Sequence, residues 1–159
     1  MKTRAIVDGD CEWIRSVFNE HWASSIMVTR GTVHQADQLP GFIAYQGKRK
    51  VGLITYIIRN SGCEIVSLNS LETGRGIGSL LVKKTLEFAA SRHCNRVWLI
   101  TTNDNSGALI FFQKSGFQLV AVHRNAISQS RSLKPAIPET GHHGIPIRDE
   151  IELEIMLAQ

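Results

Sequence analysis

The alternation of apolar and polar residues in the first forty positions predicts one strand and one helix. Residues 2–7 alternate loosely, as a strand does. Apolar residues then recur at the spacing of a helix that ends near Trp22, namely at Trp13, Ile14, Val17 and Phe18. Asp8 or Asp10 would cap the start of that helix. Residues 23–40 follow neither period, so we expect a loop or short irregular pieces there.

Three strand-like segments come next, at residues 41–46, 50–59 and 63–70, and the turn-forming sequences QGKR and NSG join them. This order predicts an antiparallel meander. Residues 77–91 are apolar on most sides and predict a helix that is covered almost all round. Residues 96–102 carry apolar side chains facing both ways, which indicates a central strand covered by helices.

The last third of the chain predicts a helix and two strands. The helix covers residues 105–115, with Asn105 as its N-cap and Gly116 available to end it. Strands are expected at residues 117–127 and, from strict alternation, at residues 150–157. The connection between these two strands is far longer than a hairpin needs.

That connection, residues 128–149, carries five basic or imidazole side chains: Arg131, Lys134, His142, His143 and Arg148. As a hypothesis, it forms a lid over an acceptor site and favours an acceptor with a carboxylate or phosphate. The alternative is a disordered or oligomer-contacting loop. The adjacent histidines lack the spacing of metal ligands and have no cysteine or acidic partner close by, so we predict no metal site.

Composition narrows the class of protein. The 159 residues are 43% hydrophobic and 20% charged, which is typical of one globular domain, and we expect residues 1–159 to form it. The net charge of +4 favours anionic ligands, but the basic residues are scattered and match no nucleic-acid-binding motif. The three cysteines lack paired spacing, and no segment is long and apolar enough for a signal peptide or a membrane span. We therefore expect a cytoplasmic protein with no membrane partner.

Three glycines two residues apart, Gly74, Gly76 and Gly78, lie between a predicted strand and a predicted helix. This order points backbone N–H groups and the positive end of a helix dipole at one place, which suits a phosphate or pyrophosphate. The P-loop is set aside because no Gly-Lys-Ser/Thr ending follows, and the dinucleotide fingerprint lacks a further glycine. Taken alone, the motif is equally consistent with a merely tight turn.

Residues 64–82, EIVSLNSLETGRGIGSLLV, resemble the acetyl-CoA-binding motif of the GNAT family of N-acetyltransferases, whose signature is Gln/Arg-x-x-Gly-x-Gly/Ala. Residues 105–117, NSGALIFFQKSGF, resemble a later motif of the same family. The resemblance implies a single α/β domain in which helices flank a central mixed sheet. It also implies transfer of an acetyl group from acetyl-CoA to a primary amine by direct attack.

The resemblance assigns contacts with coenzyme A. It implies that the glycine turn surrounds the pyrophosphate, through Thr73, Gly74, Arg75, Gly76, Ile77, Gly78 and Ser79. The pantetheine arm is expected to pair with the backbone of Leu68, Asn69 and Ser70, and to meet Asn105 on its other side. Lys114 would either meet a cofactor phosphate or remain a solvated lysine.

Two positions depart from the family pattern. Thr73 stands where the family usually has Gln or Arg, and we expect cofactor binding to survive because the turn binds mainly through its backbone. Phe112, expected at the cofactor, replaces the tyrosine that protonates the departing thiolate in many members, and phenylalanine cannot donate a proton. A thiol of ordinary pKa leaves as thiolate without absolute need for an acid. The alternative donors are Tyr45, Tyr56, His123 or water.

Glu64 is the candidate catalytic base, because an ammonium group must lose a proton before it attacks, and glutamate often stands on this strand in the family. The alternative is a half-exposed strand residue paired with a nearby lysine. A backbone N–H near Leu68 or Asn69 would stabilise the oxyanion. The first helical region, which in the family often borders the acceptor pocket, carries side chains that burial preference assigns to core or cover: Trp13, His21 and Trp22.

Two other functions stay open. Phe112 favours a non-catalytic acyl-CoA sensor, which predicts cofactor binding without turnover. An RNA- or DNA-contacting protein predicts salt-sensitive binding and leaves the glycine turn unexplained. The acceptor is open between a small-molecule amine and a peptide amine, and an exposed edge strand in the C-terminal third would make a homodimer unsurprising.

Overall fold

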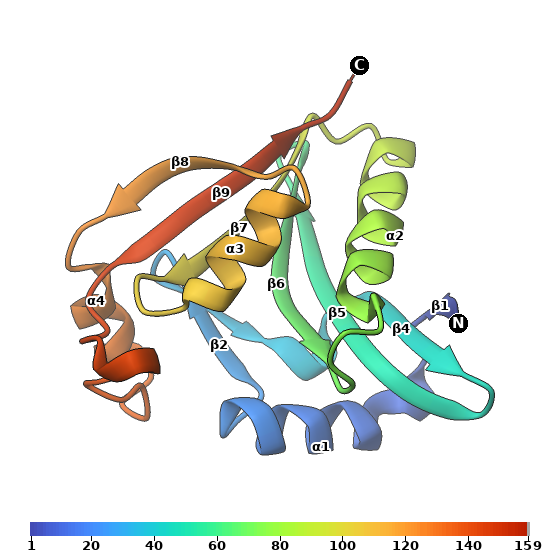
Figure 1. Cartoon of the computed structure of the whole chain (residues 1–159), viewed down its shortest axis with the longest axis horizontal. Coiled ribbons are helices and arrows are strands. Elements are labelled where there is room, and N and C mark those ends of the chain that lie inside the picture. Colours follow the sequence, from blue (N-terminus) through green and yellow to red (C-terminus); the bar gives the residue numbers. More distant parts are fainter. Residues whose placement is uncertain (159) are drawn as a thin grey trace.

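The computed structural model describes residues 1–158, and most of its strands belong to one sheet (Figure 1). These strands are β1 (Lys2–Ala5), β4 (Gly41–Gln46), β5 (Arg49–Arg59), β6 (Gly62–Ser70), β7 (Arg96–Thr102), β8 (Gln118–His123) and β9 (Glu150–Met156). Their order across the sheet is β1-β4-β5-β6-β7-β9-β8. Only the pair β6 and β7 is parallel, so a crossover helix must connect those two strands.

Helices cover both faces of the sheet. The crossover helix α2 (Ile77–Ser91) and helix α3 (Ser106–Lys114) pack on one face, where Leu81 and Phe112 join the larger apolar core. Helix α1 (Cys11–Trp22) packs on the opposite face through Phe18, against Ile43 and Leu53. The mixed sheet flanked by helices, the meander β4–β6 and the central strand β7 agree with the expectations from sequence.

Asp10 precedes α1 as expected, but its side chain does not cap the helix. The carboxylate instead forms a bidentate pair with Arg4 at 2.7 and 2.8 Å and a further pair with Lys50 at 2.8 Å, and it accepts the N–H of Val7 at 2.9 Å. Because Arg4 lies on β1 and Lys50 on β5, this carboxylate ties the first strand to the sheet beside α1.

The expectation of irregular structure at residues 23–40 is wrong. That segment contains the hairpin β2 (Ile26–Thr29) and β3 (Thr32–Gln35), followed by the short helix η2 (Ala36–Gln38). Arg30 and Gly31 form the turn, and both have positive φ, at 48° and 74°. A two-residue turn of this kind matches the twist of antiparallel strands. Gly31 adopts its positive φ without the steric cost that a side chain would add.

The expected strand at residues 117–127 is too long. β8 ends at His123, and the chain then enters helix α4 (Ala126–Leu133) through Asn125, whose φ is 59°. The segment 128–149 is therefore part helix, and it also contains the short helix η3 (His142–Gly144). Asn tolerates the left-handed backbone better than other non-glycine residues do, which explains why the chain turns there.

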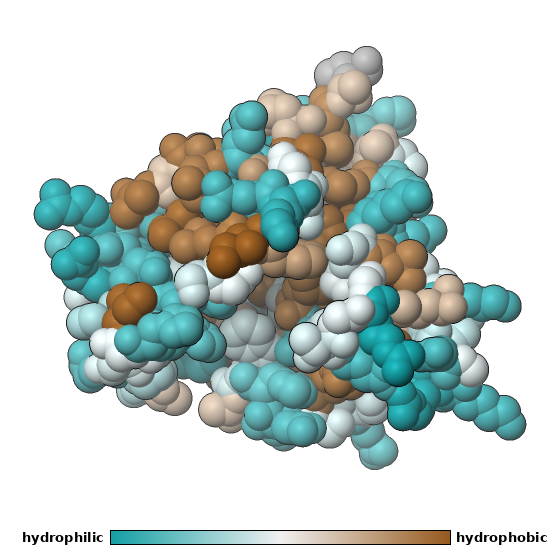
Figure 2. Space-filling view, in the orientation of Figure 1, coloured by the Kyte–Doolittle hydropathy of each residue, from teal (hydrophilic) through white to brown (hydrophobic). Residues whose placement is uncertain are grey.

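Strand β8 forms one edge of the sheet and exposes an apolar surface. Leu119, Val120 and Val122 are each about half exposed or more. Figure 2 shows brown, apolar atoms over the part of the molecule where Figure 1 draws β8, β9 and α3. No helix within residues 1–158 is long and apolar enough to cross a membrane.

Candidate active site

The parallel strands β6 and β7 separate part of the way along their length. Their pairing runs from Gly62 beside Arg96 to Ile65 beside Leu99, although β6 continues to Ser70 and β7 to Thr102. A β-bulge in the β5–β6 pair falls at the same level, where Tyr56 pairs with Ile65 but Thr55 pairs with Ser67. The bulge bends β6 away from its neighbour, which leaves backbone groups after residue 65 without a β7 partner.

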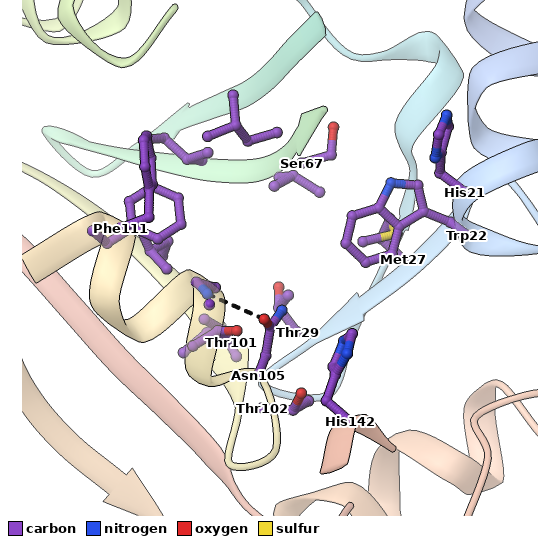
Figure 3. Close-up of a pocket in the computed structure, with 18 of the residues that line it drawn as sticks. His21, Trp22, Met27, Thr29, Ser67, Thr101, Thr102, Asn105, Phe111 and His142 are labelled. Carbon is purple, nitrogen blue, oxygen red and sulfur yellow. Dashed lines mark hydrogen bonds between the residues drawn. The ribbon is translucent and has the colours of Figure 1, made fainter. Parts of the chain in front are cut away.

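A cavity of about 1090 Å³ occupies this separation and extends to the N-terminus of α2. Its wall includes ten of the residues predicted from sequence to bind coenzyme A: Leu68, Ser70, Thr73, Gly74, Gly76, Ile77, Gly78, Ser79, Asn105 and Phe112. Figure 3 shows Phe111 and Asn105 on one side of the cavity and Trp22, Met27 and His142 on the other. The cavity thus runs from the glycine turn to a part lined by residues that are distant in the chain, among them Met27, Thr29, Ile127 and Glu150. We call this part the second chamber.

The glycine turn presents its backbone at the start of α2. Gly74 and Gly76 have φ of 73° and 72°, and Gly76 is the N-cap residue of the helix. Gly78 allows close packing instead, because a Cβ there would meet the ring of Phe111 at 3.1 Å. Two glycines therefore shape the turn and the third brings α2 close to α3, an arrangement suited to a pyrophosphate.

Helix α3 forms the opposite wall. The Asn105 side chain accepts the N–H of Ala108 at 3.1 Å, which is the N-cap expected from sequence. Phe112 is buried and packs edge-on against Phe111 and Phe117, with ring centroids 5.0 and 5.3 Å away. Phe112 lines the cavity with an apolar ring, so it contributes shape but no proton.

Glu64 belongs to a buried hydrogen-bonded chain of three side chains. The Thr29 hydroxyl lies 2.6 Å from Glu64 Oε1 and 2.7 Å from His34 Nε2, and all three residues are buried. An ionised carboxylate can only accept, so Thr29 donates its single proton to Glu64 and His34 Nε2–H donates to Thr29. The interpretation of Glu64 as a half-exposed residue paired with a lysine is wrong.

Burial sets the protonation behaviour of this chain. It raises the pKa of the Glu64 carboxyl, and the nearby carboxylates of Glu150 and Glu152 raise it further, against the opposing hydrogen bond from Thr29. Burial also lowers the pKa of His34, which favours the neutral ring. The cavity wall includes Thr29 but not Glu64, so the Thr29 hydroxyl stands between the carboxylate and the cavity.

Several residues singled out from sequence lie away from the cavity wall. The Asn69 side chain points toward α1 and accepts Trp22 Nε1–H at 3.1 Å, while Arg75 and Lys114 are exposed. The candidate proton donors are also elsewhere: Tyr45 on β4, Tyr56 in the core against Phe42 and Phe88, and His123 beside Glu152. Trp13 packs at the α1 core, whereas His21 and Trp22 line the cavity.

The segment after β8 closes the second chamber, but its basic residues have different surroundings. Arg131 donates to the carbonyls of Ile137, Pro138 and Ile147 and so holds the segment's shape. Lys134 and His142 line the cavity. The remaining two are not part of the wall: Arg148 pairs with Asp149, and His143 is exposed.

Sequence reasoning missed the residues of the second chamber: Met27, Thr29, Ser67, Ile127 and Glu150. A signal existed for two of them, because IMVT and TVHQ flank an Arg-Gly pair, which is typical of a hairpin. Nothing comparable marks Ile127 or Glu150, since their position at the cavity depends on how α4 and β9 pack against the hairpin.

Comparison with known proteins agrees with this geometry. The model of the acetyltransferase (GNAT) family matches residues 10–117. The uncharacterized protein YdhI of Bacillus subtilis is 44% identical over 135 residues, which cover 84% of each chain. Two solved structures share the fold: a Bacillus subtilis acetyltransferase in complex with CoA (TM-score 0.69, 19% identity, covering 99% of this chain and 100% of that one) and a GNAT acetyltransferase from Elizabethkingia anophelis with acetyl-CoA bound (TM-score 0.69, 19% identity, covering 98% and 97%).

Proposed function

Since this chain belongs to the GNAT acetyltransferase family, we propose that it transfers the acetyl group of acetyl-CoA to a primary amine bound in the second chamber of the cavity. Family membership supports an acetyl-CoA-dependent acyltransferase over the two alternatives, a non-catalytic sensor and a nucleic-acid-binding protein. The acceptor and the residues that act on it are the new part of the proposal. They are supported by the continuous cavity that joins the glycine turn to Thr29.

Coenzyme A fits the first part of this cavity. The pyrophosphate would lie on the backbone N–H groups of residues 74–79, at the positive end of α2. The pantetheine arm would enter between β6 and β7, where the strands stop pairing. Its amides would meet the segment Leu68, Asn69 and Ser70 on the side that has no β7 partner, since β5 pairs with the other side. A backbone N–H at Leu68 or Asn69 would then face the thioester oxygen as negative charge develops on it.

The chain of Thr29 and Glu64 provides a route for the proton. An ammonium N–H entering the second chamber can donate to a lone pair of Thr29 Oγ1 while Thr29 gives its own proton to Glu64 Oε1. The amine nitrogen gains its lone pair, Glu64 becomes a neutral carboxylic acid, and Thr29 is regenerated. The raised pKa of Glu64 assists, because it makes the carboxylate a better base.

Attack of the neutral amine forms the C–N bond, and collapse of the tetrahedral intermediate breaks the C–S bond. The sulfur leaves as thiolate with the electron pair of that bond, and water takes the surplus proton of the new amide nitrogen. Phe112 at the cavity wall gives no proton, and Tyr45, Tyr56 and His123 lie off the wall. None of the donors considered from sequence thus stands at the wall, whereas His21 and His142 do. The sulfur can leave as thiolate on the acidity of the CoA thiol, without a protein acid.

The proposal is tested by calorimetric titration with acetyl-CoA, followed by measurement of free-thiol release across a panel of primary amines. We expect binding in the micromolar range together with thiol release for at least one amine. Binding without release on any amine contradicts the transferase, and absence of binding contradicts the assigned cofactor site. The variant Glu64→Gln should keep acetyl-CoA affinity and lose turnover, which separates the base from the cofactor contacts.

A further inference from the structure

Lys134 supplies the cationic side chain of the second chamber. It is the residue directly after α4, and its backbone N–H donates to the Ser130 carbonyl at 2.8 Å. Among the lining residues of the described chain, Lys134 is the single Lys or Arg. The segment that follows Lys134 is held in place, because the Arg131 guanidinium donates to the carbonyls of Ile137 and Pro138.

The Lys134 ammonium has no anionic partner within the described residues. Its recorded contact is a long hydrogen bond of 3.5 Å from Nζ to the carbonyl of Trp22, at the end of α1. Burial lowers the pKa of Lys134, and no carboxylate offsets that effect. A partly buried ammonium without a counter-ion is costly, and an anion placed beside it would remove the cost.

The buried carboxylates of the same wall are already satisfied. Glu150 accepts the backbone N–H of Arg30 at 3.2 Å and pairs with the Arg30 guanidinium at 3.3 Å. Asp104 accepts the Thr102 hydroxyl at 2.5 Å and the backbone N–H of His142 at 2.9 Å. Glu20, the third carboxylate of the wall, is exposed to solvent. The two buried negative charges therefore have internal donors, whereas the positive charge of Lys134 has no anionic partner among the described residues.

The neighbourhood of Lys134 strengthens an ionic contact. Apolar residues contributed by the same segment line the chamber: Ile127, Ala136, Ile137, Pro138 and Ile147. Apolar walls lower the local dielectric, so a paired charge gains more there than at the open surface. Thr29, the entry point of the proton route, lines the same cavity.

We propose that Lys134 binds an anionic group of the acceptor, a carboxylate or a phosphate, so that the acceptors are amines that carry an acidic group. This inference rests on the proposed function, because the amine of the same molecule would have to reach Thr29. It narrows the hypothesis made from sequence, because Arg131 holds the fold of the segment and Arg148 pairs with Asp149, whereas Lys134 lines the cavity.

The test compares pairs of amines that differ in the acidic group alone. One arm uses ω-amino carboxylates from glycine to 6-aminohexanoate, each against its primary carboxamide. A second arm uses 2-aminoethyl phosphate against ethanolamine. The readout is the ratio of kcat/KM for the two members of a pair, measured for the wild type, for Lys134→Met, for Lys134→Arg and for the exposed-surface control Lys48→Met.

In the wild type we expect at least one acidic amine to be preferred over its neutral partner by about tenfold, the effect of one good ionic contact. Lys134→Met should bring that ratio close to one. Lys134→Arg should retain most of the preference, and Lys48→Met all of it. The two amines of a pair differ in basicity, but this difference affects every variant equally, because all variants are assayed with the same pairs.

Equal ratios in the wild type and Lys134→Met overturn the inference, as does a tenfold weaker affinity of Lys134→Met for acetyl-CoA, which would assign the lysine to the cofactor. Calorimetry of each amine with the CoA-loaded protein covers the case in which no thiol is released. Binding of an acidic amine that depends on Lys134 then supports the anion site while the transferase proposal fails. Binding that does not depend on Lys134, or no binding of any acidic amine, overturns the inference.

Discussion

The hydroxyl of Thr29 lies 2.6 Å from the carboxylate of Glu64, although the two residues are 35 positions apart in the chain. Thr29 ends β2, in a hairpin outside the main sheet, and Glu64 lies on β6 within it. The contact therefore brings a cavity-facing hydroxyl from one element to a buried carboxylate of another, and the packing of the hairpin on the sheet decides whether the proton route exists.

Removing the Thr29 hydroxyl should slow the transfer step. Thr29→Val keeps the shape of the side chain but interrupts the route to Glu64, and we expect kcat to fall by about a hundredfold, the lower end of the range for lost proton transfer. Thr29→Ser should retain most activity because it keeps the hydroxyl. Steady-state kinetics at several pH values measure this, and equal kcat for wild type and Thr29→Val would argue that Glu64 reaches the amine by another path.

Replacing Glu64 should separate stability from activity. Because burial raises the pKa of Glu64, the folded protein keeps a proton on this carboxyl at a pH where the unfolded chain has released it. The stability linked to this group is thus present below the unfolded pKa and is lost as the pH rises through the folded pKa.

Glu64→Gln has no such dependence, since its amide does not ionise. Its melting temperature should exceed that of the wild type by a few degrees at pH 8 and match it near pH 4, while turnover falls about a hundredfold. Thermal unfolding between pH 4 and pH 8 measures the first effect. A wild type that gains stability relative to the variant toward high pH would contradict the raised pKa.

The left-handed backbone at Gly76 should be necessary for cofactor binding. A side chain at φ 72° costs about 1–2 kcal/mol, and the turn can avoid that cost only by moving its N–H groups. Gly76→Ala should weaken acetyl-CoA binding by about tenfold in calorimetry.

Gly47→Ala is the matched control for this change. Gly47 has φ 59° with open space around its Cβ position, as Gly76 does, but lies in the β4–β5 turn. It should lose comparable stability and keep its affinity for acetyl-CoA. Similar loss of affinity in both variants would show that general strain, not the turn, weakens binding.

Asp10 should contribute stability at neutral pH that acid removes. The hydrogen bond from Arg4, with those from Lys50 and Val7, lowers the pKa of Asp10, so its contribution is present above the unfolded pKa and is lost as the pH falls below it. Asp10→Asn should cost about 1.5–3 kcal/mol at pH 7, the range for a lost hydrogen bond to a charged group, because Arg4 and Lys50 are partly exposed and solvent screens the pairs.

Urea unfolding at pH 7 and pH 3 measures that cost. The variant and the wild type should approach each other at pH 3, because the unfolded wild-type chain takes up a proton at Asp10 there while the folded protein, with its lowered pKa, does not. A gap that stays constant between the two pH values would mean that Asp10 acts through packing and not through its charge.

The elements around the proposed cofactor site could be predicted from sequence because their signals are local. The glycine turn, the start of α2 and the cap at Asn105 each depend on residues within a few positions of one another. These elements have the boundaries that the sequence indicated.

The acceptor half could not be predicted in the same way. Thr29, Ile127 and Glu150 reach one cavity through contacts between segments that are distant in sequence. Hydrophobic periodicity reports which face of an element is buried but not which other element covers it. The hairpin of β2 and β3 could have been predicted, although it was not. Gly31 and the β-branched residues around it are typical of a tight turn between strands.

The wall of the second chamber combines residues from two parts of the chain. Its closing portion, from Ile127 to Glu150, lies beyond residues 10–117, where the family model matches. The glycine turn and the separated strands lie inside that match. A substitution in the C-terminal segment would therefore alter the second chamber without touching the glycine turn, which makes this segment the place to redesign the choice of amine independently of the donor.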